Sequence, residues 1–269
     1  MFHGAIENGR IFYSEKGKGL GCFLAEQGFN VYVADFRGRG KSRPHITEDS
    51  DHGYYECIVH DIPDIVNYVA SKTEQPVHVV CHSWGGVLFN SALVRFKALQ
   101  QQVQSLVCFG TKRQVLVWNP ERLLKVSMVW NRLAPLISRR RGYLDAERLK
   151  IGADFETHRS ISQSVSWVKP SPWVDPVDGF NYEAAARKMH WPPVWHLTGI
   201  KDKALGHAKD VEVFIKETHN PNTRFDILST KTGAHLDYDH INILTHPKTR
   251  TDHFPQVVDF MLASAQPPK

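Results

Sequence analysis

The sequence contains no long hydrophobic run and few cysteines. No apolar stretch reaches about 18 residues, the length that indicates a membrane-spanning helix. The first residues, MFHGAIENGR, lack a basic segment followed by an apolar one, so we expect no signal peptide. The four cysteines are widely spaced in apolar segments, which is typical of reduced, buried thiols (Cys22, Cys57, Cys81 and Cys108). We therefore expect a cytoplasmic protein without a membrane span; its oligomeric state is not indicated.

The charge balance indicates no nucleic-acid partner. The net charge is +5, and part of the excess is local, in Arg139–Arg141. A basic run can contact the phosphates of a nucleic acid, but most runs of this size are simply solvated. We therefore expect no nucleic-acid binding. The chain of 269 residues is long enough for one large α/β domain or two small domains.

Short apolar segments alternate with helical patterns along most of the chain. We expect strands at Phe29–Asp35, Val77–Val80, Val103–Phe109, Pro193–Leu197 and Thr223–Leu228. Five helices are expected. The first covers about 17–27, and the second runs from Asp61, which caps it, to Val69. The third begins after Gly86, the fourth covers 208–219, and the last begins near Asp252. This alternation predicts βαβ units, and so an α/β fold with a mostly parallel sheet and helices on both faces.

The alternation of expected strands and helices is interrupted between residues 114 and 190. This stretch holds four of the seven tryptophans, Trp118, Trp130, Trp167 and Trp173. We interpret it as a mainly helical lid inserted into a core formed by residues 1–113 and 191–269. The tryptophans either contact a substrate or form the core of the insert, and the sequence does not separate these alternatives.

One strand-to-helix junction has the pattern of a nucleophile elbow. Residues Val77–Gly86 read VHVVCHSWGG, which places Ser83 at a sharp turn between small residues. In the usual pattern, G-x-S-x-G, the first glycine stands where this chain has Cys81. The alternative is an ordinary junction in which Ser83 caps the helix.

A nucleophilic serine needs a histidine as base and a carboxylate that orients the histidine. Asp202 follows one expected strand, and His240 lies in the loop after the next strand. The chain order Ser83, Asp202, His240 is the order of an α/β-hydrolase. Asp202 also has a simpler interpretation as a helix cap.

Four segments carry a resemblance to a known family: His3-Gly4, Asp35–Ser42 (DFRGRGKS), His82–Gly86 (HSWGG) and Gly199–Asp202 (GIKD). In this order, they resemble the α/β-hydrolase superfamily, in its lipase/esterase-like branch with a lid insert. The resemblance implies hydrolysis of a small, apolar acyl substrate without a cofactor. It also implies that the oxyanion is bound by the main-chain N–H groups of Ala5 and Trp84.

The catalytic histidine has two candidates. In the family, this histidine is commonly followed by an apolar residue and then Asp or Asn, at a set spacing before the last helix. His240, with Ile241, Asn242 and later Phe254, fits that pattern, whereas His235 does not. We therefore predict His240 as the base.

Two other chemistries were weighed against this interpretation. A cluster of histidines and aspartates resembles a set of metal ligands (His235, Asp237, Asp239, His240 and His246), but no second cluster completes a site, so we expect no metal. The glycine-rich segment Phe36–Ser42 resembles a phosphate loop but lacks the spacing of one.

The N-terminal region departs from the family pattern. Only Met1 and Phe2 precede His3, too few for the central strand that the family has there. We expect either a truncated gene start or a rearranged sheet, and a rearranged sheet would displace Ala5. The first hypothesis is a serine hydrolase that cleaves a carboxylic ester. The alternatives are a catalytically silent protein of the same fold that binds an apolar ligand or a partner, and an acyltransferase.

Overall fold

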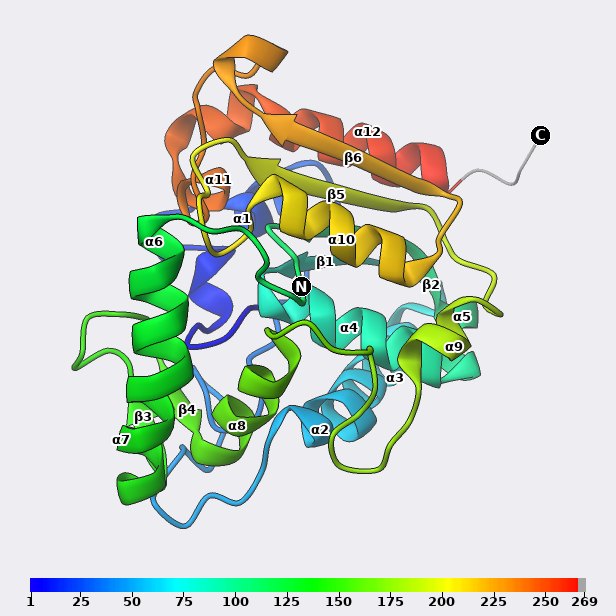
Figure 1. Cartoon of the computed structure of the whole chain (residues 1–269). Coiled ribbons are helices and arrows are strands. Elements are labelled where there is room, and N and C mark those ends of the chain that lie inside the picture. Colours follow the sequence, from blue (N-terminus) through cyan, green and yellow to red (C-terminus); the bar gives the residue numbers. More distant parts are fainter. Residues whose placement is uncertain (266–269) are drawn as a thin grey trace.

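The computed structural model describes residues 1–265, which form a parallel sheet with helices on both faces (Figure 1). The strand order is β1-β2-β5-β6, and all three pairings are parallel. The strands are β1 (Val77–His82), β2 (Val103–Phe109), β5 (Val194–Gly199) and β6 (Thr223–Leu228). The expected α/β class is therefore confirmed, and the bounds predicted for β2 and β6 are those observed.

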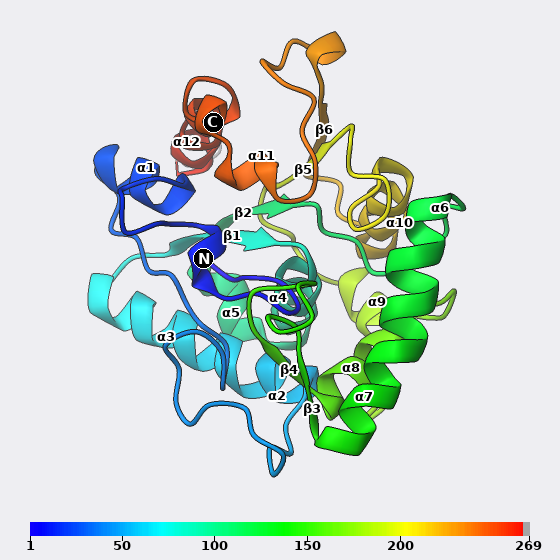
Figure 2. The same ribbon diagram turned by 90° about the vertical axis from the view of Figure 1, so that its left-hand side faces the viewer.

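Alternate residues of the central strands pack into two separate cores. Val79 and Cys81 of β1 face one core, and Val80 faces the other, as the two-residue period of a strand requires. The first core is covered by α3 (Ile62–Thr73), α4 (Trp84–Arg95), α5 (Lys97–Gln102) and α10 (Ala208–Thr218). The second core is covered by α1 (Leu20–Glu26), α11 (Asn242–Thr245) and α12 (His253–Ser264). Figure 2 shows α1 and α12 on one side of the sheet and α3 on the other.

The strand expected at Phe29–Asp35 is not formed. This segment has a single isolated bridge, between Ala34 and Phe2. The reason is that its only neighbour is very short. The Met1 carbonyl accepts from the Ala34 N–H at 3.0 Å, and the Phe2 N–H donates to the Val80 carbonyl at 2.8 Å.

Met1 and Phe2 thus fill the gap between residues 32–34 and β1. Although the central strand of the family is not formed here, Phe2 bridges to both Ala34 and Cys81. The segment that begins at His3 therefore enters the molecule directly beside the end of β1.

The helix expected to start at Asp61 begins earlier. It runs from α2 (Tyr54–Glu56) through a π-helical turn, η2 (Cys57–Asp61), into α3. Asp61 makes no capping hydrogen bond, because its carboxylate pairs with the Arg37 guanidinium. Three short 3-10 helices are described outside residues 114–190: η1 (Gly9–Ile11), η4 (Thr230–Thr232) and η5 (Pro247–Thr251). No helix within residues 1–265 is both long and apolar enough to cross a membrane.

Residues 114–190 form several helices and one small hairpin. A long helical segment consists of α6 (Pro120–Arg122), η3 (Leu123–Leu133) and α7 (Ala134–Arg141). The antiparallel pair β3 (Tyr143–Asp145) and β4 (Phe155–Thr157) follows, then α8 (His158–Trp167) and α9 (Tyr182–Ala186). The tryptophans differ in environment: Trp167 and Trp173 lie in the first core, and Trp118 is 73% exposed.

Candidate active site

Ser83 lies at the sharp turn between β1 and α4. Its φ of 50° and ψ of −124° are unusual for a residue with a side chain. Strained backbone conformations of this kind cluster at active sites and ligand-binding positions. The turn is held by two hydrogen bonds: the Ser83 N–H donates to the Phe109 carbonyl at 2.8 Å, and the Thr111 hydroxyl donates to the Ser83 carbonyl at 3.1 Å. The Ser83 side chain makes no capping bond to α4, so the helix-cap alternative is wrong.

Two glycines allow the loop after Phe2 to approach this turn closely. A Cβ on Gly85 would lie 2.3 Å from the His3 carbonyl oxygen, and a Cβ on Gly4 would lie 2.9 Å from the Ser83 Cβ. Either contact is shorter than atoms can tolerate, so only glycine fits. Cys81, in place of the first glycine of the pattern, is fully buried in β1.

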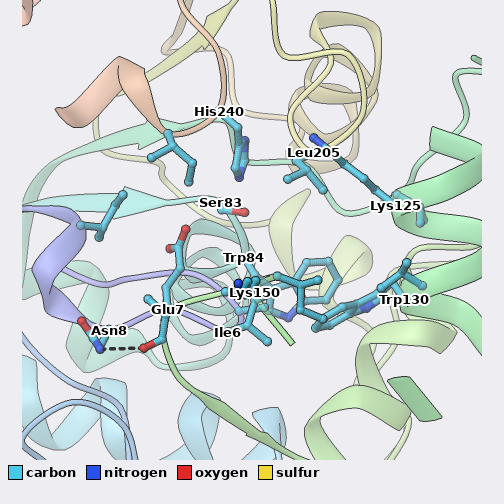
Figure 3. A pocket seen from close by; sticks show the side chains of 18 of the residues that line it. Ile6, Glu7, Asn8, Ser83, Trp84, Lys125, Trp130, Lys150, Leu205 and His240 are labelled. Carbon is cyan, nitrogen blue, oxygen red and sulfur yellow. Dashed lines mark hydrogen bonds between the residues drawn. The ribbon is translucent and has the colours of Figure 1, made fainter. Parts of the chain in front are cut away.

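A cavity of about 770 Å³ opens above Ser83 (Figure 3). Its walls come from the loop after Phe2, from the loop after β6 and from residues 114–190. Most of the lining from residues 114–190 is apolar, with Leu124, Val126, Val129 and Trp130 among it. Figure 3 shows Ser83 between His240 and Glu7, with Trp130 on the opposite wall.

His240 lines this cavity and is paired with Asp202. The His240 Nδ1 lies 2.5 Å from the Asp202 Oδ2, and both side chains are buried. Burial alone would raise the pKa of Asp202, but the charge and hydrogen bond of His240 lower it to about 2. The other oxygen of Asp202 accepts from the Leu205 N–H at 2.9 Å, while α10 is capped by His207.

His235 is in a different environment. Its side chain is exposed, and its main-chain N–H donates to the Asp252 carboxylate at 2.7 Å. The structure thus brings together Asp202 and His240, the two residues predicted to act together, and leaves His235 outside the cavity.

In the loop Gly4–Glu7, the main-chain N–H groups of Gly4 and Ile6 have partners, and those of Ala5 and Glu7 have none in residues 1–265. The Gly4 N–H donates to the Glu7 carboxylate at 2.8 Å, and the Ile6 N–H donates to the Glu156 carboxylate at 3.0 Å. Between them, the Ala5 N–H has no partner in residues 1–265. The N–H of Trp84, the first residue of α4, also has no partner there, as is usual in the first turn of a helix. The two predicted oxyanion donors both line the cavity.

The sequence analysis missed an ion pair beneath Ser83. His82 Nδ1 lies 2.8 Å from the Glu7 Oε2, and His82 Nε2 lies 2.9 Å from the His240 carbonyl oxygen. Because a carboxylate and a carbonyl only accept, both ring nitrogens of His82 carry protons, and the ring is an imidazolium. The local sequence offers only the position of His82 beside Ser83 as a signal.

The pKa values of this pair agree with that assignment. Burial would raise the pKa of Glu7, but the charge and hydrogen bond of His82 lower it to about 2. Burial would lower the pKa of His82, but Glu7 and the His240 carbonyl raise it above its ordinary value. His82 therefore holds the main chain of His240, and Glu7 holds that of Gly4, through one charged pair.

The two alternative chemistries are not supported by the geometry. The side chains of the suggested metal cluster have separate partners; for example, Asp237 accepts from Thr230, and Asp239 accepts from Ile241. Within the described residues, the atoms close enough to share an ion belong instead to Glu7, His82 and His240.

In the glycine-rich segment, both arginines are already paired. Arg37 binds Asp61, and the fully buried Arg39 binds Glu156 of β4. These guanidinium groups hold the loop to its neighbours, so they do not form a phosphate site.

Curated relatives match about a third of the chain. Triacylglycerol lipase 1 of Arabidopsis thaliana is 28% identical over 100 residues, which are 35% of this chain and 25% of the relative. The matched region thus spans only about a quarter of that relative.

Solved structures match over a much larger share of the chain. A soluble variant of monoglyceride lipase from Saccharomyces cerevisiae is 15% identical with a TM-score of 0.64, and the match covers 98% of this chain and 85% of that one. Monoacylglycerol lipase from Paleococcus ferrophilus is also 15% identical, with a TM-score of 0.59 and coverage of 98% and 93%. At such identities, the likeness shows the fold alone.

The family described as serine aminopeptidase, S33, matches residues 1–161. This is more than half of the 269 residues, and the matched part includes the elbow at Ser83. The chain therefore belongs to this family of the α/β-hydrolase superfamily.

Proposed function

We propose that the protein is a serine hydrolase that cleaves a carboxylic ester through Ser83, His240 and Asp202. The observation that carries the proposal is the strained Ser83 at the floor of a cavity that His240, hydrogen-bonded to Asp202, also lines. Each of these residues follows the carboxyl end of a parallel strand, and such ends meet at one edge of a sheet.

In the proposed reaction, the Ser83 hydroxyl attacks the ester carbonyl, and His240 takes its proton. Asp202 orients the imidazole and stabilises its charged form. The N–H groups of Ala5 and Trp84, which have no partner in the described chain, stabilise the oxyanion. The alcohol leaves with the proton from His240, and water then releases the acid from the acyl-enzyme by the same steps.

The cavity supports an apolar acyl substrate. Its largest wall consists of aliphatic and aromatic side chains from residues 114–190, which we propose to be a lid over the core of residues 1–113 and 191–269. The relative and the structural neighbours that are named lipases are in keeping with this choice. The cysteines are free, and the cytoplasmic location that they suggested stays a prediction.

The test is labelling with a fluorophosphonate, measured by intact mass. We expect one adduct on the wild type and none on Ser83→Ala. Ser71→Ala, which removes an exposed helical hydroxyl, is the matched control and is expected to label like the wild type. An unlabelled wild type that is folded, or an adduct retained by Ser83→Ala, would contradict the mechanism. Loss of ester turnover in Ser83→Ala with an unchanged melting temperature completes the test.

A further inference from the structure

Lys112 is a buried cation in the wall of the cavity that the proposed mechanism does not use. It follows β2 in the segment Gly110-Thr111-Lys112, and only 8% of its surface is exposed. The Lys112 ammonium lies 5.8 Å from the centre of the Trp84 ring. Trp84 directly follows the proposed nucleophile, Ser83, in the sequence. Its side chain has neither a hydrogen bond nor an ion pair with any residue from 1 to 265.

Among the other cations that line the cavity, Arg10 and Lys125 are paired, whereas Lys150 is exposed and its side chain has no partner in residues 1–265. Arg10 binds Glu15 at 2.6 Å, and Lys125 binds Glu121 at 2.5 Å. Glu7 is the only acidic residue among those that line the cavity, and its charge is taken up by His82.

Two acids beyond the cavity, Asp202 and Asp210, act on the charge of Lys112, and the Oδ2 of Asp210 is buried without a hydrogen-bond partner in residues 1–265. Asp202 is bound to His240, and an oxygen of Asp210 accepts from the N–H groups of Leu116 and Val117. They act on Lys112 through space, without a direct contact.

A buried ammonium group without an acceptor is unfavourable. Burial lowers the pKa of Lys112, which expresses the cost of holding its charge away from water. An anion in the cavity would accept hydrogen bonds from this ammonium and balance its charge, and hydrogen bonds between charged groups are the strong ones. The cavity that Ser83 lines is thus arranged to bind a negative group at Lys112.

We propose that Lys112 binds a carboxylate on the substrate, so that the preferred esters are half-esters of dicarboxylic acids. This inference rests on the proposed function. The ester carbonyl lies at Ser83, the methylene chain lies along the apolar wall, and the free carboxylate reaches Lys112 beside Trp84. Lys112 is then a residue that determines specificity rather than one that takes part in bond cleavage.

The first test compares pairs of esters that differ only at the far end. Monomethyl succinate, glutarate, adipate and suberate are each paired with the methyl ester in which a methyl group replaces the carboxylate. We expect the wild type to have the higher kcat/KM for the half-ester at one chain length. In Lys112→Met, this preference is expected to fall by about tenfold to a hundredfold, the range for a lost hydrogen bond between charged groups.

Two further variants make the result specific. Lys125→Met removes another lysine of the cavity, one already paired with Glu121, and its preference is expected to stay within about threefold of the wild type. Lys112→Arg keeps the charge and is expected to restore most of the preference. A wild type without preference at any chain length, or an unchanged preference in Lys112→Met, would overturn the proposal.

A binding experiment separates this inference from the proposed reaction. Ser83→Ala and the double variant Ser83→Ala/Lys112→Met are titrated with monomethyl adipate, with tryptophan fluorescence as the signal, because Trp84 and Trp130 line the cavity. Weaker binding by the double variant upholds the anion site even if no ester is cleaved. Equal binding by the two variants counts against the site, whatever the outcome for hydrolysis.

Discussion

Replacing Gly85 by alanine tests how closely the elbow and the loop after Phe2 must approach. The added Cβ would lie 2.3 Å from the His3 carbonyl oxygen and 2.7 Å from the Phe2 carbonyl oxygen. Ordinary contact begins near 3.4 Å, so the main chain must move by about 1 Å. Both obstacles are backbone atoms, and Phe2 is hydrogen-bonded to β1, so no side-chain rotation relieves the contact.

The expected magnitude follows from that displacement. A misplacement of about 1 Å at an active site reduces the rate about a hundredfold, and overpacking costs about 1–3 kcal/mol of stability. We therefore expect Gly85→Ala to react with a fluorophosphonate about a hundred times more slowly than the wild type. It should also unfold at lower denaturant, by an amount equivalent to about 2 kcal/mol.

Gly17→Ala is the matched control. Gly17 has a φ of 70°, which disfavours alanine, but a Cβ there would meet no atom within 4 Å. It is expected to lose about 1 kcal/mol of stability while its labelling rate stays unchanged. If Gly85→Ala labels within threefold of the wild type, the close approach does not position the site and the reasoning is refuted.

Two other predictions concern the residues around Ser83. His240→Ala is expected to reduce ester turnover by at least about a thousandfold and His235→Ala by less than threefold, as measured by kcat; the reverse ranking would transfer the role of base to His235. The second prediction concerns the Glu7–His82 pair, whose loss in Glu7→Gln is expected to cost about 3 kcal/mol of stability. The pKa of Glu7 is lowered from 4.5 to about 2, and that of His82 is raised above 6.5, so the pair stabilises the fold most between about pH 4.5 and 6.5. Stability from the pair is lost as the pH falls from 4.5 through 2, where Glu7 is protonated, and as the pH rises through the pKa of His82, where His82 loses its charge. The difference in the free energy of unfolding between wild type and Glu7→Gln should therefore vary with pH, and a constant difference would contradict the ion pair.

The parallel sheet was predictable because its inner strands, β2 and β5, are almost entirely buried and therefore rich in apolar residues. Segments such as Val103–Phe109 carry that signal in a few adjacent residues. The segment Phe29–Asp35 has the same composition but forms only a bridge. A strand depends on its neighbour for hydrogen bonds, and composition does not show that this segment meets its neighbour in a single bridge, at Ala34 and Phe2.

Site residues were predictable where a local pattern surrounds them. Ser83 is marked by its turn, and Asp202 and His240 by their places after strands. Glu7 and Lys112 carry no such pattern, because their positions depend on how distant segments meet. Glu7 reaches a histidine 75 residues away, and Lys112 lines a cavity whose other lining residues come from distant segments, including residues 124–130 and 150–153.

The order of these segments has a consequence for the chain as it is synthesised. The face of the sheet formed by Val80 and Val107 is covered partly by α12, one of the last elements to be made. Until α12 docks, that apolar face is open to water, to chaperones and to other nascent chains. His240 is also made long after Ser83, so the proposed nucleophile and its proposed base are joined only when this later part of the chain folds onto the sheet.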